Sequence, residues 1–284
     1  MLRPATGRGR SRTSFGLSGP IFVTLRRSPA PDRLSRVRKR ILITGASAGL
    51  GEEMARQFGA LDRDLALCAR RLPRLEALRS EVTAAHPGVT VAVRALDVTD
   101  HDAVFRVFRK LRDELGGLDR IVVNAGLGKG QPLGTGYFAA NKQTAEVNFV
   151  AALAQCEAAM EIFREQGAGH LVVISSMSAM RGMPRNLTTY AATKAGVAAL
   201  AEGIRADVLG TDIRVTTIFP GYIRSEMNAR VRRTPLLVDT EPGVRSMVRA
   251  IERERPHAYT PAWPWTPLSF AMRHLPLRLL AKVT

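Results

Sequence analysis

The sequence has 284 residues, of which 42 are Lys or Arg and 25 are Asp or Glu, so its formal net charge is +17 at pH 7. This length suits one large α/β domain or two small ones, and a hydrophobic content of 45% excludes a chain that is disordered throughout. Two cysteines, Cys68 and Cys156, are too few for a disulfide framework, and no run of 18 apolar residues predicts a membrane-spanning helix.

The positive charge, which by itself suggests nucleic acid or an anionic membrane as partner, is concentrated at the two ends. Residues 1–40 carry a net charge of +10, residues 41–223 carry +1 and residues 224–284 carry +6. We expect residues 1–36 to be a basic, disordered extension, although their Arg- and Ser-rich composition also fits a transit peptide or an over-extended start. A nucleic-acid-binding arm is disfavoured, since only Phe15 and Phe22 interleave aromatic rings with the charges.

From residue 37 to residue 255, short apolar runs alternate with longer amphipathic stretches. The predicted strands are Ile41–Thr44, Leu65–Cys68, Val89–Val93, Arg120–Val123, Leu171–Ser175 and Val215–Phe219. The predicted helices are Leu50–Ala60, Leu72–Ala85, Asp100–Glu114, Asn141–Glu165 and Thr189–Leu209. Apolar runs without polar alternates are typical of strands buried on both faces. The pattern predicts an α/β fold with a single Rossmann-type, doubly wound parallel sheet and helices on both faces.

The first predicted βα unit opens with a glycine-rich turn, Thr44-Gly45-Ala46-Ser47-Ala48-Gly49-Leu50-Gly51. Glycines let the backbone turn sharply and approach a pyrophosphate closely, and the following helix N-terminus offers free N–H groups. The spacing, Gly-x3-Gly-x-Gly after a threonine, resembles the short-chain dehydrogenase/reductase family. Gly45, Ser47, Gly49, Leu50 and Gly51 are therefore candidate cofactor-binding residues.

The second predicted strand ends in Arg70-Arg71, at the place where this fold contacts the adenosine ribose. A carboxylate there would accept from a free 2′-hydroxyl, whereas two guanidiniums suit a 2′-phosphate. The pair thus favours NADP(H) over NAD(H), and it resembles the NADP-preferring branch of the family. The alternative is that both arginines are solvated loop charges.

Further motifs of the family follow in chain order. Asp97 is placed to accept from an adenine amino group and Val98 to cover the ring, while Asp100 or Thr99 is expected to cap the next helix. The Asn124-Ala125-Gly126 segment is similar to the family's Asn-Ala-Gly motif. In this resemblance Asn124 ties neighbouring strand ends together, and Ala125 and Gly126 leave room for the cofactor.

Tyr190 and Lys194 are four residues apart in a predicted helix, which places them on one helix face. A nearby cation is expected to lower the pKa of the phenol towards the range useful for acid–base catalysis. The resemblance makes Tyr190 the acid–base, gives Lys194 a contact to the nicotinamide ribose, and assigns Ser176 to hold the substrate oxygen. Ser175 and Ser178 remain alternatives to Ser176, because the Ser176–Tyr190 spacing is one residue longer than in many members.

The resemblance also assigns Asn148, which lies 24 residues after Asn124, to a water that links the lysine to solvent; the alternative is a satisfied mid-helix amide. Pro220, Gly221 and Ile223 resemble the family's Pro-Gly segment beside the nicotinamide. The five histidines are too scattered for a ligand set, so no metal site is predicted.

Residues 226–238 are expected to form a flexible lid, followed by a helix from about Asp239 to Glu254. Residues 256–284 form a C-terminal segment that mixes apolar and basic side chains. This segment suits an anionic membrane surface, a cover over the substrate pocket or a contact with another subunit. Met177, Met180 and Met183 suggest a soft apolar pocket, although core packing explains them too.

The sequence thus predicts an NADP(H)-dependent oxidoreductase that transfers a hydride between the nicotinamide and a carbonyl or secondary alcohol of a lipophilic substrate. The alternative within the same fold is a nucleotide-sensing or scaffold protein without turnover, which the intact set of Asn148, Ser176, Tyr190 and Lys194 disfavours. We expect a cytoplasmic homodimer or homotetramer that contacts no nucleic acid, with peripheral membrane contact through the C-terminal segment as an open alternative.

Overall fold

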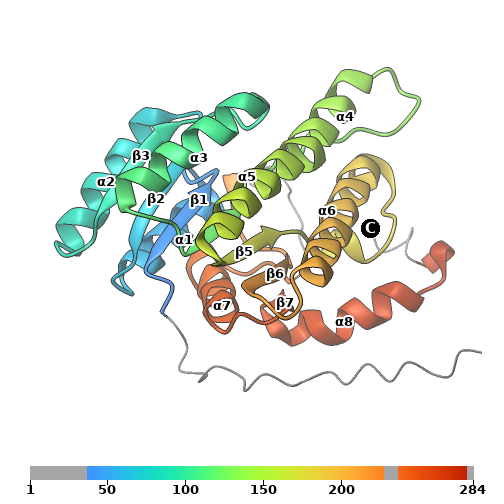
Figure 1. The fold of residues 1–284 in the computed structure, drawn as a ribbon. Helices are drawn as coiled ribbons and strands as arrows, with labels where there is room; N and C mark the ends of the chain where they lie inside the picture. Colours follow the sequence, from blue (N-terminus) through green and yellow to red (C-terminus); the bar gives the residue numbers. More distant parts are fainter. Residues whose placement is uncertain (1–36, 227–235, 280–284) are drawn as a thin grey trace, which may run out of the picture. The chain divides into compact units, whose positions relative to one another are not determined.

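A computed structural model describes residues 37–226 and 236–279 (Figure 1). The predictions for residues 1–36 and for most of the expected lid lie outside the described residues. None of the described helices is long and apolar enough to cross a membrane.

Within the described residues, seven strands form one parallel sheet in the order β3-β2-β1-β4-β5-β6-β7. The strands are β1 (Arg40–Thr44), β2 (Asp64–Ala69), β3 (Val91–Ala95), β4 (Arg120–Val123), β5 (Ala168–Ile174), β6 (Asp212–Pro220) and β7 (His257–Thr260). The order confirms the predicted doubly wound parallel sheet, because the chain first builds outwards from β1 to β3 and then from β4 to β7.

Helices cover both faces of the sheet (Figure 1). They are α1 (Gly49–Gly59), α2 (Leu72–Ala85), α3 (His101–Leu115), α4 (Phe138–Ala145), α5 (Ala151–Gln166), α6 (Thr188–Asp207), α7 (Thr240–Glu252) and α8 (Ala262–His274). Two 3-10 turns, η2 (Met177–Met180) and η3 (Arg185–Leu187), lie between β5 and α6. One apolar core joins α3, α5 and α6 to the sheet, and the other joins α1, α2 and α7 to it.

The six predicted strands are all present, and β3 begins two residues later than the apolar run Val89–Val93 suggested. The predicted helix Asn141–Glu165 is divided by a π-turn, η1 (Glu146–Val150), in which the amide of Ala151 bonds the carbonyl of Glu146. As predicted, the Asp100 carboxylate caps α3, by accepting from the amide of Ala103 at 2.9 Å.

β7 was not predicted, because its four residues carry no apolar run. β7 pairs with β6 and lies at the edge of the sheet, beyond residue 255. After it, α8 packs beside β7 and η2. The C-terminal segment therefore lies against the part of the sheet that carries Pro220 and Ser176.

Candidate active site

Most of the predicted site residues follow the carboxyl ends of β1, β4, β5 and β6. These ends share one edge of the sheet, since the strands are parallel and adjacent in that order. The chain connections leave β1 and β4 in opposite directions, and in open α/β sheets the ligand-binding crevice is found at such a point of this edge.

The turn after β1 is so tight that two of its glycines, Gly45 and Gly51, have no room for a side chain. Gly45 and Gly49 have positive φ angles of 65° and 56°. A Cβ on Gly51 would lie 2.5 Å from the carbonyl oxygen of Gly45, and one on Gly45 would lie 2.9 Å from Cα of Ala125. No side chain caps the N-terminus of α1 at Ala48, so its first-turn amides are available to a phosphate.

Asn124 and Thr44 join the two strand ends on either side of the crevice. The Asn124 side-chain amide donates to the carbonyl of Thr44 at 2.9 Å. The Thr44 hydroxyl accepts from the backbone amides of Asn124 and Ala125, each at 3.0 Å. These bonds hold the glycine turn beside the Asn124-Ala125-Gly126 segment.

Beside the ribose position, Arg71 is anchored on the glycine turn. Its Nε donates to Ser47 Oγ at 3.2 Å, and one terminal nitrogen donates to the carbonyl of Ser47 at 3.3 Å. Arg71 also pairs with Glu226 at 3.1 Å, and Arg74 pairs with the same carboxylate at 2.5 Å. Neither Arg74 nor Glu226 was predicted from the sequence. Arg74 could have been found there, because it is an arginine three residues after Arg71 in the first turn of a predicted helix.

Arg70 is exposed and lies near Asp97. Burial acts to raise the pKa of Asp97, but hydrogen bonds from Thr99 and the charge of Arg70 lower it below its usual range. Val98 is buried next to it. The ends of β2 and β3 therefore bring together Arg70, Arg71, Asp97 and Val98 as the sequence suggested.

Lys194 is the buried cation of the site. Its Nζ donates to the carbonyl of Ile174 at 2.9 Å and lies 6.0 Å from the centre of the Tyr190 ring. Burial lowers the pKa of Lys194 to about 8. The expected net lowering of the tyrosine pKa is wrong for this structure: burial raises the pKa of Tyr190 above its ordinary value, and a hydrogen bond with Ser176 only partly opposes that.

Of the three candidate serines, Ser176 is the one that contacts Tyr190. The Ser175 hydroxyl is buried and donates to the carbonyl of Lys194 at 2.7 Å. The backbone amide of Ser178 donates to Ser176 Oγ at 3.1 Å, so this residue supports Ser176. The Ser176 and Tyr190 hydroxyls thus lie together, with Lys194 near the Tyr190 ring.

Asn148 lies in the π-turn η1 and is buried. Its carboxamide bonds both backbone groups of Leu127, accepting from the amide at 2.7 Å and donating to the carbonyl at 2.8 Å. Gly126 lies between this side chain and Lys194, because a Cβ there would be 3.5 Å from Asn148 Oδ1 and from Lys194 Nζ. Asn148 thus fixes the loop after β4 next to the lysine.

The Pro220-Gly221 segment is covered by α8. A Cβ on Gly221 would lie 2.0 Å from Cε2 of Trp265, a residue that the sequence analysis did not single out. Trp265 packs with Met177, Met180 and Phe219 in an apolar cluster next to Ser176. Of the three roles open for the C-terminal segment, covering the site is the one that these contacts match. Ile223 is buried, and its strand bridge to Val238 continues the segment towards α7.

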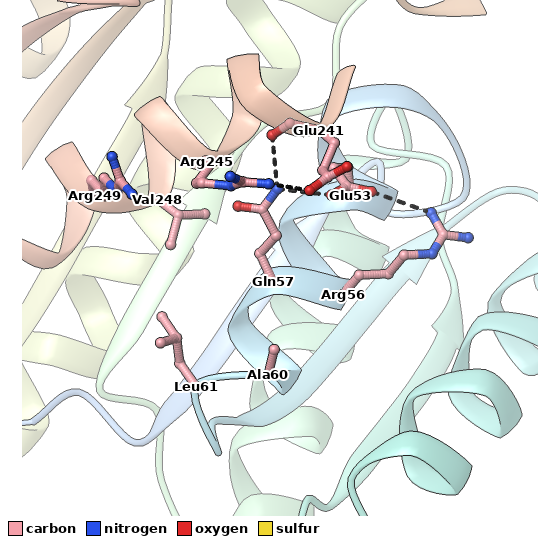
Figure 2. Close-up of a pocket in the computed structure, with 9 residues that line it drawn as sticks. All are labelled: Glu53, Arg56, Gln57, Ala60, Leu61, Glu241, Arg245, Val248 and Arg249. Atoms are coloured by element: carbon pink, nitrogen blue, oxygen red, sulfur yellow. Dashed lines mark hydrogen bonds and ion pairs between the residues drawn. The ribbon is translucent and has the colours of Figure 1, made fainter. Parts of the chain in front are cut away.

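A groove of about 410 Å³ between α1 and α7 contains none of the predicted site residues (Figure 2). Four of its five charged side chains are paired with one another: Arg245 pairs with Glu241, and Arg56 with Glu53 (Figure 2). Among the described residues, no group of three or more His, Cys, Asp or Glu side chains could hold a metal ion.

Comparisons with known proteins show the family of the chain. Residues 39–236 match the sequence model of the family described as short chain dehydrogenase. An uncharacterized oxidoreductase of Mycobacterium tuberculosis is 53% identical over 85% of this chain and 96% of its own length.

Two solved structures have the same fold. An alcohol dehydrogenase from the archaeon Thermococcus sibiricus, complexed with 5-hydroxy-NADP, has a TM-score of 0.70 and 26% identity, over 78% of this chain and 95% of its own. A short-chain dehydrogenase from Sphingobium yanoikuyae, in complex with NADPH, has a TM-score of 0.71 and 26% identity, over 83% of this chain and 94% of its own.

Proposed function

Because this chain belongs to the short-chain dehydrogenase/reductase family of oxidoreductases, we propose that it transfers a hydride between NADP(H) and a carbonyl or secondary alcohol. The observation that carries the proposal is the contact between the Ser176 and Tyr190 hydroxyls beside a buried Lys194. A protein that only senses a nucleotide has no need of this arrangement.

The nicotinamide cofactor supplies or accepts the hydride when bound, and the chain's own residues handle the proton. Since burial raises the pKa of Tyr190, its hydroxyl stays protonated at neutral pH and is ready to donate to a substrate oxygen. Ser176 donates to the same oxygen and orients it. Lys194 holds positive charge beside the phenol below about pH 8, which favours the phenolate left after donation. Asn148 positions the loop that borders the lysine.

Three features support NADP(H) as the cofactor. The glycine turn and the uncapped N-terminus of α1 fit a pyrophosphate, and no side chain could be added at Gly51 without blocking that turn. Arg70 and Arg71 offer cations where a 2′-phosphate would lie. The similar structures from Thermococcus sibiricus and Sphingobium yanoikuyae carry NADP-type cofactors.

The apolar cluster of Met177, Met180, Phe219 and Trp265 supports a lipophilic substrate. Further from the site, Phe149, Val150 and Leu153 are exposed on η1 and α5, and this apolar stripe supports pairing of two subunits of a cytoplasmic enzyme. The exposed Phe270 and Leu277 at α8 suit a second subunit or, with Arg273 and Arg278, an anionic membrane surface.

The experiment that tests the function is NADPH oxidation against a panel of apolar ketones and aldehydes, with NADH in parallel. Tyr190→Phe removes one hydroxyl oxygen and is expected to abolish turnover while leaving cofactor affinity nearly intact. Tyr137→Phe, which removes the same atom from an exposed ring, is the matched control. Wild-type turnover by Tyr190→Phe would refute the catalytic role, and a preference for NADH would refute the choice of cofactor.

A further inference from the structure

The carboxylate of Glu226, which follows β6, lies between two guanidiniums that come from the segment after β2. Glu226 Oε2 is 3.1 Å from Arg71 and Glu226 Oε1 is 2.5 Å from Arg74. Arg71 and Arg74 stand three residues apart at the start of α2, whereas Glu226 follows β6 more than 150 positions later. Each arginine therefore binds a different oxygen of one anion.

Arg71 is held in place by a second element as well. Its remaining donors bond the hydroxyl and the carbonyl of Ser47, in the glycine turn after β1. The guanidinium of Arg71 is thus fixed in position where it faces Glu226, and Arg74 adds a second guanidinium to the same anion-binding site. Two guanidiniums around separate oxygens are the arrangement by which arginines bind phosphate.

We propose that Glu226 is a specificity-determining residue, whose carboxylate occupies the phosphate position on Arg71 and Arg74 and competes there with the 2′-phosphate of the cofactor. The inference rests on the proposed function in one respect, namely that Arg71 receives the 2′-phosphate of NADP(H). It adds an intramolecular competitor to that site.

Competition follows from the donors available. The N–H groups that Arg71 and Arg74 donate to Glu226 are those that a phosphate needs, and two anions bound to the same two arginines repel each other. A 2′-phosphate therefore has to release the carboxylate, whereas a cofactor with a free 2′-hydroxyl does not. Glu226 thus weakens the binding of the phosphorylated cofactor and not that of the cofactor with a free 2′-hydroxyl. It therefore reduces the preference for NADP(H) over NAD(H) that the arginines create.

The displacement is feasible because the ion pairs are exposed. The side chains of Glu226, Arg71 and Arg74 are 56%, 44% and 53% exposed. Water and salt screen such pairs, so each changes an equilibrium constant by a factor of only about 1.5 to 5. Glu226 is therefore expected to modulate the affinity for the phosphorylated cofactor without blocking its site.

The test is equilibrium binding of two probes that differ by one phosphate, adenosine 2′,5′-bisphosphate and adenosine 5′-monophosphate, to the full chain. Glu226→Gln keeps the size of the side chain and removes its charge. Glu81→Gln is the matched control, because Glu81 is 53% exposed and binds Arg56 with both oxygens, away from the ribose position. Arg71→Gln tests the underlying site.

Glu226→Gln is expected to tighten the bisphosphate about 2- to 10-fold and to change the monophosphate by less than about twofold, while Glu81→Gln changes neither. Unchanged or weaker bisphosphate binding, or equal tightening of both probes, would overturn the inference. If Arg71→Gln weakens the bisphosphate but Glu226→Gln has no effect, the inference fails and the NADP(H) proposal stands. If Arg71→Gln has no effect, the choice of NADP(H) fails and the inference falls with it.

Discussion

Replacing Arg120 with methionine is expected to destabilise the fold at the amino ends of the strands, far from the catalytic edge. Arg120 is fully buried, donates to His170 Nδ1 at 2.9 Å and pairs with Glu252. Since Nδ1 accepts, the proton of the neutral imidazole is on Nε2, which bonds the Thr216 hydroxyl at 2.8 Å. Burial and the charge of Arg120 lower the pKa of His170 well below its usual value, so the ring stays neutral.

The magnitude follows from what each partner loses. In Arg120→Met, His170 Nδ1 becomes a buried acceptor without a donor, which costs about 1–3 kcal/mol. Glu252 is 27% exposed and keeps its ion pair with Arg63 at 3.0 Å, so the loss of its ion pair with Arg120 adds up to about 1 kcal/mol. Methionine still packs against Phe58, over whose ring the guanidinium lies. The expected total is about 1–4 kcal/mol.

Urea unfolding measures this loss directly. With a denaturant slope of about 2–3 kcal/mol per molar, the midpoint is expected to fall by roughly 1 M. Arg109→Gln, which breaks an exposed pair with Glu161, is the control and is expected to cost about 0–1 kcal/mol. The double variant R120M/H170M removes donor and acceptor together and is expected to be more stable than R120M. A midpoint for R120M equal to that of R109Q would refute this reasoning.

Carbonyl reduction by the wild-type chain is expected to fall as the pH rises through about 8, where the buried Lys194 loses its charge, and a flat rate profile across that pH would contradict this. Because the pKa of Lys194 is lowered in the native state, the unfolded chain binds more protons than the native one between about pH 8 and the ordinary lysine pKa of 10.5. The free energy of unfolding of the wild type should therefore rise with pH in this window relative to that of Lys194→Met. The same pH dependence in both proteins would contradict this. Gly221→Ala places a methyl group 2.0 Å from a Trp265 ring atom and is expected to cost at least about 1–3 kcal/mol, whereas Gly182→Ala, at a glycine whose added methyl group would meet nothing within 4 Å, should cost little. Equal thermal midpoints of the two variants would count against the described packing of α8. Thr260→Val removes a buried hydroxyl that has no partner among the described residues, so the thermal midpoint should hold or rise, and a clear fall would show that the hydroxyl has a partner.

The sequence predicted the parts of the fold that local chemistry specifies. Buried parallel strands read as apolar runs, and the glycine turn after β1 is visible because only glycine tolerates its φ angles and close contacts. β7 was missed because it is an edge strand of four mixed residues, whose place depends on pairing with β6. The division of the long helix before β5 was missed because a π-turn has no simple sequence signature.

The site shows the same division between local and long-range information. Tyr190 and Lys194 are paired by helix spacing, and Arg71 is placed by the end of a strand, so both were accessible from sequence. Glu226 and Trp265 reach the site from distant segments, and their contacts with Arg71 and Gly221 are tertiary. The direction of the Tyr190 pKa also depends on burial, which the spacing of two residues does not reveal.

The π-turn at Glu146–Val150 gives the chain one residue more than a regular helix would hold over the same rise. Before the π-turn, the orientation of α4 depends on its own packing. After the turn, α5 must present its apolar face to α3 and the sheet. The extra residue lets Asn148 turn towards Leu127 without rotating that face. Deleting Phe149 would close the turn into a continuous helix and leave the apolar face of α5 where it is. The extra residue therefore serves the placement of Asn148, and a chain shortened here is expected to keep the packing of α5 and to lose the bonds between Asn148 and Leu127.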